Sequence, residues 1–263
     1  MDVASLGFRT DLALLELAGS VIEDRSDHLV VTTPSNPAFY WGNFLLLDRV
    51  PPAEAVEEWL ARFAATFPGA RHRAFGFDDP RGSADDLAGF AARGLDVDAA
   101  TVMIATAVNP PPHPNPEATY RPLRSDDDWA QSVSLAITSG DSEQSEGYLE
   151  FVNRRTASNR ALSEDGHGAW FGAFLGGVLV AQLGLVGASP GLARFQSVET
   201  HPDHRRRGLA GTLVHTASEY GFAELGATTL VMVADPGYHA IRVYRSLGFT
   251  DGETQLQVEQ APG

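Results

Sequence analysis

The decisive stretch of the sequence is Val198-Glu199-Thr200-His201-Pro202-Asp203-His204-Arg205-Arg206-Arg207-Gly208-Leu209-Ala210. The apolar pattern before it predicts a strand over 193–200, and apolar spacing near 3.6 residues predicts a helix over 208–225. The first amides of a helix lack intrahelical acceptors and carry partial positive charge, so a turn that leads into a helix suits a phosphate. Three successive arginines favour such an anion site, and a solvated loop capped by Gly208 is the alternative.

Helices and strands alternate around this stretch. Before this stretch, capping and hydrophobic spacing predict a helix capped by Ser125 that runs to Ile137 and a helix from Tyr148 to Leu162. A hairpin of 170–175 and 178–186 around Gly176-Gly177 follows them. After the strand and helix named above, we expect a strand at 228–233, a helix at 238–247 and a strand at 254–258. This order predicts an α/β sheet with mixed strand directions. The uncharged run 169–188 could cross a bilayer, but its central Gly-Gly pair favours a hairpin, so we expect no membrane segment.

A second motif follows at 241–249, with the sequence Ile-Arg-Val-Tyr-Arg-Ser-Leu-Gly-Phe. The two motifs together resemble the GNAT acyltransferase superfamily over roughly residues 120–258. In that superfamily the turn Gln/Arg-x-x-Gly-x-Gly/Ala cradles the pyrophosphate of acetyl-CoA, and Arg205, Gly208 and Ala210 stand at its defining places. The resemblance implies an acetyl-CoA site made of Val198, Thr200, Arg205, Arg206, Arg207, Gly208, Leu209, Ala210 and Gly211, with the backbone of the first two along the pantetheine arm.

The same resemblance implies an N-acetyltransferase that acts on a primary amine, in which Tyr244 protonates the departing thiolate. The structural alternative for Tyr244 is a packed ring with a hydrated hydroxyl. Our first choice for the base that deprotonates the amine is Glu199, and His201, His204, Asp235 and a water chain to a distant carboxylate remain alternatives. The competing function is a non-catalytic acyl-CoA-binding regulatory module that keeps the cradle and has lost the base.

Two positions depart from the family pattern. The last helix often begins with an asparagine that contacts CoA, three residues before an alanine, and here Gly237 precedes Ala240 at that spacing. Only 14 residues follow Phe249, so the usual final strand is expected to be short, missing or supplied by the other half of the chain.

The first half of the chain repeats part of this order. The run 193–247 has a parallel in a strand at 43–48, a helix at 53–67, a strand at 73–77 and a helix at 83–93. This shared order favours an internal duplication over a chance alignment. Pro51 and Pro52 offer no N–H to a phosphate, and Phe90 stands where the repeat places Tyr244, so neither cradle nor acid survives there. For the aromatic cluster Phe39, Tyr40, Trp41 and Phe44, core packing is favoured over lining an acceptor cleft.

A proline-rich segment separates the two halves. We therefore expect an α/β fold of two GNAT-like mixed-sheet domains in tandem: a degenerate one at 1–108, a linker at 109–118 and a catalytic one at 119–263.

Composition limits the remaining classes. The chain has 263 residues, 43% of them hydrophobic, and no cysteine, which excludes disulfides, thiolate nucleophiles and cysteine-ligated metals. A net charge of −15 disfavours nucleic acid as a partner and favours the approach of cationic amine acceptors. Residues 1–20 lack a signal-peptide pattern, so we expect a cytoplasmic protein, and we expect no metal site.

Overall fold

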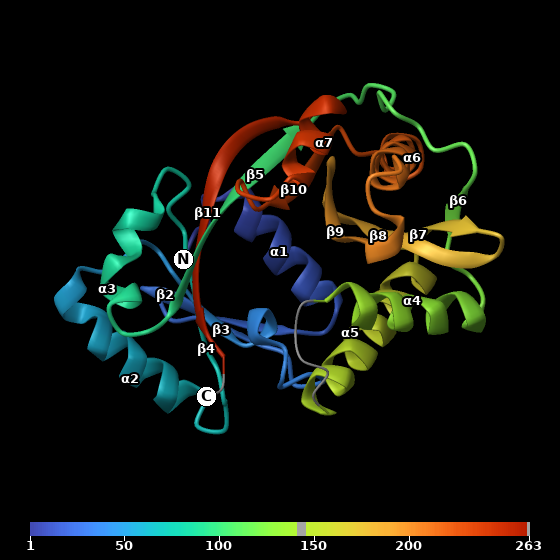
Figure 1. The fold of residues 1–263 in the computed structure, drawn as a ribbon. Coiled ribbons are helices and arrows are strands. Elements are labelled where there is room, and N and C mark those ends of the chain that lie inside the picture. Colours follow the sequence, from blue (N-terminus) through green and yellow to red (C-terminus); the bar gives the residue numbers. More distant parts are fainter. Residues whose placement is uncertain (141–145, 262–263) are drawn as a thin grey trace. The chain divides into compact units, whose positions relative to one another are not determined.

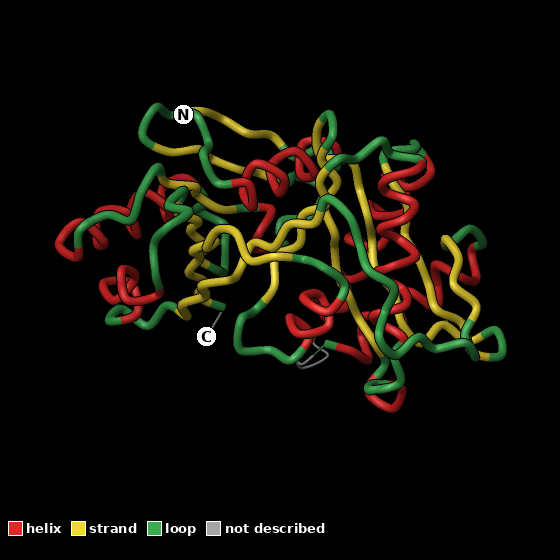
Figure 2. The backbone as a smooth tube through the Cα atoms, turned by 90° about the horizontal axis from the view of Figure 1, so that it is seen from above, coloured by secondary structure: helices red, strands yellow, loops and turns green. Residues whose placement is uncertain are grey.

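The computed structural model describes residues 1–140 and 146–261. The chain forms two compact units, each with strands flanked by helices (Figures 1 and 2). Unit 1 contains Met1–Val102, Val233–Pro236 and the segment that begins at Gly252; unit 2 contains Met103–Met232 and Gly237–Asp251. The division therefore differs from a simple cut at the proline-rich segment, because the C-terminal strand lies mostly in unit 1.

Unit 2 carries the elements expected around the decisive stretch except the C-terminal strand, and one additional strand precedes them. In chain order they are β6 (Thr119–Pro122), α4 (Asp126–Ser139), α5 (Glu146–Glu164), β7 (Gly168–Leu175), β8 (Val178–Ser189), β9 (Leu192–Thr200), a short 3-10 helix (Pro202–His204), α6 (Leu209–Ala223), β10 (Thr229–Ala234) and α7 (Ala240–Ser246). The strand order is β10-β9-β8-β7-β6; β9 and β10 are parallel and the other neighbours antiparallel. Ser125 caps α4, and Gly176-Gly177 forms the turn between β7 and β8, as predicted.

Helices cover both faces of this sheet. Figure 1 shows α6 on one face of β7–β9, and α4 with α5 on the other. Alternate residues of β8 face the two layers: a Cβ at Gly221 of α6 would lie 2.8 Å from the Leu185 side chain, whereas Gln182 bonds to Ser132 of α4. The uncharged run 169–188 is thus a hairpin, and no helix in the described part of the chain is long and apolar enough to cross a membrane.

Unit 1 is a second mixed sheet between helices. Its elements are α1 (Leu6–Leu17), β1 (Val21–Asp24), β2 (His28–Thr32), β3 (Phe44–Leu47), α2 (Val56–Thr66), β4 (Arg73–Phe77), α3 (Ala88–Ala91), most of β5 (Asp96–Ala105) and most of β11 (Thr250–Gln260), with 3-10 helices at Tyr40–Gly42, Ala53–Ala55 and Ala84–Leu87. β3 and β4 are parallel, and β11 pairs antiparallel with β4. Leu45 and Leu47 of β3 join the apolar cluster of α2 and α3, whereas Phe44 and Leu46 join that of α1.

Helices α3 and α7 end in the same way, which supports the predicted duplication. The carbonyl of Phe90 accepts a hydrogen bond from the amide of Leu95 at 3.3 Å, and the carbonyl of Tyr244 accepts one from the amide of Phe249 at 3.2 Å. A glycine with positive φ completes each turn: Gly94 (φ 79°) and Gly248 (φ 100°). The same backbone turn therefore ends both helices, and its aromatic residue is Phe90 in one half and Tyr244 in the other.

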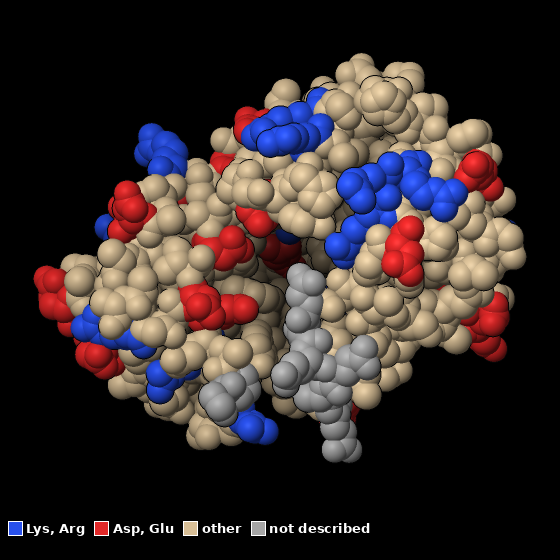
Figure 3. Space-filling view, in the orientation of Figure 1, with Lys and Arg blue, Asp and Glu red and all other residues tan. Residues whose placement is uncertain are grey.

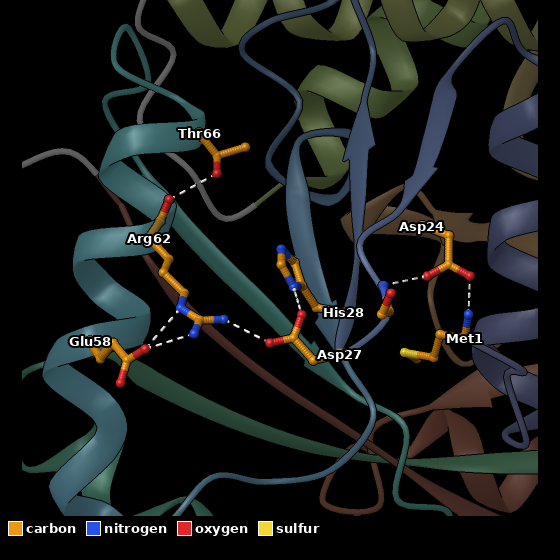
Figure 4. Close-up of polar contacts among 8 residues, drawn as sticks. Met1, Asp24, Asp27, His28, Glu58, Arg62 and Thr66 are labelled. Carbon is orange, nitrogen blue, oxygen red and sulfur yellow. Dashed lines mark hydrogen bonds and ion pairs between the residues drawn. The ribbon is translucent and has the colours of Figure 1, made fainter.

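A polar network on the surface of unit 1 connects α2 to the start of β2 (Figure 4). Arg62 donates to Glu58 at 2.7 Å and to Asp27 at 2.8 Å, and Asp27 contacts the His28 ring at 2.6 Å. The pKa of Asp27 is lowered, most by its hydrogen bond with the His28 ring and next by the one from Arg62. Because Arg62, Glu58 and Asp27 are largely exposed, their two ion pairs contribute at most about 1 kcal/mol each.

The first turn of α4 depends on a buried carboxylate, and this generates a stability prediction. Asp128 accepts two hydrogen bonds from Arg121, each at 2.7 Å, and others from the amides of Arg124 and Ser125. The bond from Arg121, followed by those amides, holds the pKa of Asp128 well below its usual range. Asp128→Asn should therefore lower the free energy of unfolding at pH 7 by about 1–3 kcal/mol in urea titrations.

This stabilisation is present above the unfolded-state pKa of about 4 and is lost as pH falls toward the lower folded-state pKa. The difference between the wild type and Asp128→Asn should accordingly shrink below about pH 4. Asp126→Asn is the matched control, because Asp126 is exposed and its ion pair among the described residues is with Arg160, so the change should alter stability by less than about 1 kcal/mol. Equal effects of the two substitutions would contradict the assigned role of Asp128.

Candidate functional site

A β-bulge interrupts β9 at the candidate site. Glu199 stands opposite Gln182 and Gln196 stands opposite Gly184, so Ser197 and Val198 together face the single residue between them on β8. Ser197 has a φ of 48°. The extra residue places Glu199 on the α4 side of the sheet, together with Gln182.

Strand β9 also leaves its other neighbour early. The parallel pairing of β9 with β10 runs only from Leu192–Thr229 to Arg194–Val231, although both strands continue. Along residues 195–200 the β10 side of β9 is therefore free of ladder partners among the described residues. Val198 and Thr200, the two backbone positions expected along a pantetheine arm, lie in this open segment.

The turn after β9 presents unpaired amides. After the 3-10 helix, Arg206 (φ 62°) and Gly208 (φ 77°) adopt left-handed conformations, and α6 begins at Leu209. Within the described ranges, no backbone or side-chain group accepts a hydrogen bond from the amides of residues 206–211. Successive free amides at a helix N-terminus form a concave site for an anion.

The three arginines of the turn have different surroundings. Arg205 donates from Nε to the carbonyl of Thr200 at 3.2 Å, and Arg207 donates to Glu117 at 2.5 Å. Arg206 is exposed and has no polar partner in the part of the chain that the structure describes. On the face seen in Figure 3, arginine side chains form separate groups among neutral and acidic ones. Arg207 is thus paired with an acidic side chain, whereas Arg205 and Arg206 have no ion-pair partner among the described residues.

The end of the proline-rich segment braces this turn, a role the sequence did not indicate. The amide of Asn115 donates to Thr212 at 3.0 Å and its side chain donates to the carbonyl of Arg207 at 2.9 Å. A Cβ on Gly208 would lie 2.1 Å from the carbonyl oxygen of His113. Gly208 is thus required both by its left-handed φ and by the close approach of this segment.

A cleft opens between helices α4 and α5 and the sheet. The α5 side is one helical face, formed by Tyr148, Phe151, Val152, Arg155, Thr156 and Asn159. The sheet contributes Trp170, Gln182, Ser197 and Glu199. Trp170 reaches the cleft because it lies over Gly184, where a Cβ would come within 2.2 Å of its ring.

Glu199 is held by a hydrogen-bonded chain inside this cleft. Gln182, only 2% exposed, donates from Nε2 to the Glu199 carboxylate at 2.6 Å. The hydroxyl of Ser132 donates to Oε1 of the same Gln182 at 2.6 Å. This chain fixes the orientation of the amide and hence of the carboxylate. Sequence reasoning missed Gln182 because an isolated glutamine in an apolar strand gives no signal of its own.

The other three candidates for the base do not line the cleft. The His201 ring accepts from the amide of Asp203 at 3.2 Å, and the His204 ring contacts Arg207 at 3.1 Å, so both belong to the turn before α6. Asp235 is exposed and falls in unit 1. Among the residues described, groups of His, Asp and Glu suited to a metal ion are also absent.

Tyr244 lies on the buried side of α7 and is 6% exposed. Its ring contacts Phe249 edge-on at 6.4 Å, and Phe249 contacts Phe195 of β9 at 5.9 Å. Burial, followed by the charge of Tyr238, raises the pKa of the Tyr244 hydroxyl above its usual value near 10. The phenol is thus kept protonated. Tyr244 packs toward β9 but does not line the cleft that contains Glu199.

The family can now be assigned. The model of the acetyltransferase (GNAT) family matches residues 135–249. Residues 135–249 form a GNAT acetyltransferase domain. This GNAT domain contains the bulge, the amide-rich turn, Tyr244 and the cleft lining apart from Ser132. Its family transfers acyl groups from acyl-CoA.

Solved structures are similar to the chain in fold. A GCN5-related N-acetyltransferase from Kribbella flavida has a TM-score of 0.64 at 15% identity, over 98% of this chain and 97% of that one. A functionally unknown conserved protein from Staphylococcus epidermidis has a TM-score of 0.70 at 11% identity, over 93% and 94%. A tandem GNAT protein from the clavulanic acid biosynthesis pathway has a TM-score of 0.54 at 16% identity, over 84% and 75%. The fold of this chain is thus two GNAT-like sheets in tandem. The comparison with curated proteins found no match.

The geometry of the GNAT turn generates a second prediction. Gly208→Ala should lower the free energy of unfolding by about 2 kcal/mol or more, because it combines left-handed strain with the clash against His113. Gly226→Ala is the matched control: Gly226 also has a positive φ, of 62°, but a Cβ there meets nothing within 4 Å. Urea unfolding of both variants gives the destabilisation caused by the clash as the difference between their losses of unfolding free energy. Equal losses in the two variants would mean that the 113–115 segment does not hold the turn.

Proposed function

We propose that unit 2 transfers an acetyl group from acetyl-CoA to a primary amine. The main support for the proposal is the row of free amides at 206–211, which follows the open end of β9 after one short 3-10 helix. An anion-sized cradle beside exposed strand backbone suits a ligand with a phosphate and an amide-bearing arm. A nearby cleft with an anchored carboxylate suits an amine.

The residues present fit acetyl-CoA. The amides of 206–211 and the guanidinium of Arg206 would hold the pyrophosphate, with Arg205 and Arg207 bordering it. The backbone of Val198 and Thr200 would hold the pantetheine arm. When bound, the group supplies an activated thioester.

The side chains of unit 2 then move protons. Glu199 accepts a proton from the substrate ammonium, which frees the nitrogen lone pair to form the new nitrogen–carbon bond. Tyr244 donates its hydroxyl proton to the sulfur as the carbon–sulfur bond breaks, and the nitrogen releases its second proton to solvent. Solvent then returns a proton to Tyr244 and takes the proton held by Glu199. Gln182 and Ser132 act through Glu199 and are positioning residues.

Unit 1 offers no comparable cradle at the corresponding helix. The short helix Ala53–Ala55 is preceded by Pro51 and Pro52, which have no N–H, and Phe90 lacks the hydroxyl of Tyr244. We therefore propose one acetyl-CoA site per chain.

A binding experiment tests the cradle. Isothermal calorimetry should give a stoichiometry near one CoA per chain, and Arg206→Glu should weaken binding about 10- to 100-fold by replacing an attractive charge with a repulsive one. Arg124→Glu, also an exposed loop arginine of unit 2, is the matched control and should leave binding unchanged. Two sites per chain, or unaltered binding by Arg206→Glu, would contradict the cradle assignment.

Activity measurements test the two proton carriers. Glu199→Gln and Tyr244→Phe should each lower kcat by about 10²- to 10⁴-fold while CoA affinity stays within a few-fold. Because burial raises the pKa of Tyr244, its deprotonation should not limit activity below about pH 10. Release of CoA thiol with a panel of amines provides the assay. A Tyr244→Phe variant with near-normal kcat and rate-limiting chemistry would make Tyr244 a packing residue.

The same assay separates the enzyme from the acyl-CoA-binding regulatory module. Binding of acetyl-CoA without thiol release, over a panel of amines, would favour the regulatory module. Thiol release that depends on the amine, with acetylated product identified by mass spectrometry, would favour the transferase.

A further inference from the structure

Two side chains of opposite charge share the cleft of unit 2 without pairing with each other. Arg155 of α5 and Glu199 of β9 both line it. Arg155 donates to the hydroxyl of Ser197, and Glu199 accepts from the amide of Gln182 at 2.6 Å. Over residues 1–140 and 146–261, neither side chain has an ion-pair partner. Each charge is therefore held by neutral groups only.

This arrangement leaves both charges poorly compensated. A partly buried charge that has lost water is stabilised most by an opposite charge with good hydrogen-bond geometry. Only one terminal nitrogen of Arg155 is engaged, so the rest of its donor fork is free to meet a planar, two-oxygen group. The buried hydroxyl of Ser139, in the same cleft, also lacks a hydrogen-bond partner among the described residues.

We propose, building on the acetyl transfer inferred above, that the acceptor is a free α-amino acid with an apolar side chain. Its carboxylate pairs with Arg155 and its ammonium with Glu199, so one small zwitterion compensates both charges of the cleft. Tyr148, Phe151 and Trp170 supply the apolar wall against which the side chain packs. Arg155 thus determines specificity, and Glu199 keeps its role as the base.

A purely structural role for Arg155 predicts a different pattern of rates. The guanidinium lies 5.7 Å from the Phe151 ring and contacts Ser197 at the bulge, so its loss could loosen β9. In that case the rates with all amines would fall together. A specificity role lowers the rate only for acceptors that carry a carboxylate, and the ratio of two acceptors separates the roles.

The experiment compares each apolar L-amino acid with its carboxamide, which keeps the amine and side chain and removes the negative charge. The ratio of kcat/KM for acid over amide is measured in the wild type, in Arg155→Gln and in Arg160→Gln. Arg160 lies on the same helix, pairs with Asp126 and Glu164 and does not line the cleft, so its substitution is the matched control. Comparing ratios between variants cancels the intrinsic reactivity of each amine.

We expect at least one apolar amino acid to be acetylated and preferred over its amide, with the preference reduced about 10- to 100-fold in Arg155→Gln and unchanged in Arg160→Gln. An enzyme that acetylates amides as well as acids, or an Arg155→Gln variant that lowers both rates equally, would overturn the proposal and leave acetyl transfer intact. Absence of turnover with every amine would instead refute the transferase. Calorimetry with L-leucine and L-phenylalanine tests separately whether the acceptor is an apolar amino acid. Binding that is weakened in Arg155→Gln would support this proposal, and absence of binding to the wild type would overturn it.

Discussion

The extra residue in β9 determines which face of the sheet Glu199 occupies, and hence whether the proposed base reaches the cleft. Phe195 stands opposite Leu185, on the α6 side, and in a regular strand Glu199 would lie on that same side because the two are four residues apart. The bulge at Ser197 and Val198 shifts the alternation by one residue, so Glu199 faces Gln182 and the cleft instead. The same disturbance coincides with the loss of pairing to β10, which leaves the backbone before the cradle open. The face that carries the Glu199 carboxylate therefore depends on one local change of register, and the open strand and the amide-rich turn lie next to it along the chain.

The comparison of the two halves separates what the fold needs from what the chemistry needs. The turns after Phe90 and Tyr244 share their hydrogen bonds and their left-handed glycine, so an aromatic ring at this point serves packing in both sheets. The hydroxyl is absent from the half that also has Pro51 and Pro52 in place of free amides. Loss of both features in one half is expected if they serve a single function, and it argues that Tyr244 is more than a core residue.

Strong local signals made much of unit 2 predictable. The Ser125 cap, the Gly176-Gly177 turn and the helix that starts after Gly208 each rest on short-range chemistry, and the observed elements match them closely. Elements without such signals were missed. The turn between β1 and β2 uses Ser26 at a φ of 74°, where a glycine would have been the signal, and α1, β5 and β6 were not predicted either. The pairing of β11 with β4 joins residues from the two ends of the chain, which no local pattern encodes.

The candidate site also has a part that local sequence encodes and a part that only the fold assembles. The amide-rich turn is a contiguous motif, so the sequence located it, whereas the cleft is assembled from α4, α5, β8 and β9, and Gln182 and Arg155 acquire meaning only there. Net charge is misleading at this scale. A total of −15 governs the long-range approach of ligands and favours cations, but within the cleft the nearest groups decide, and they are one carboxylate and one guanidinium. A ligand with a single positive charge would satisfy Glu199 and leave Arg155 beside an added cation, at a Coulomb cost that a low local dielectric increases. A zwitterion avoids that cost, so the proposal of an amino-acid acceptor rests on the local pair of charges and not on their sum over the protein.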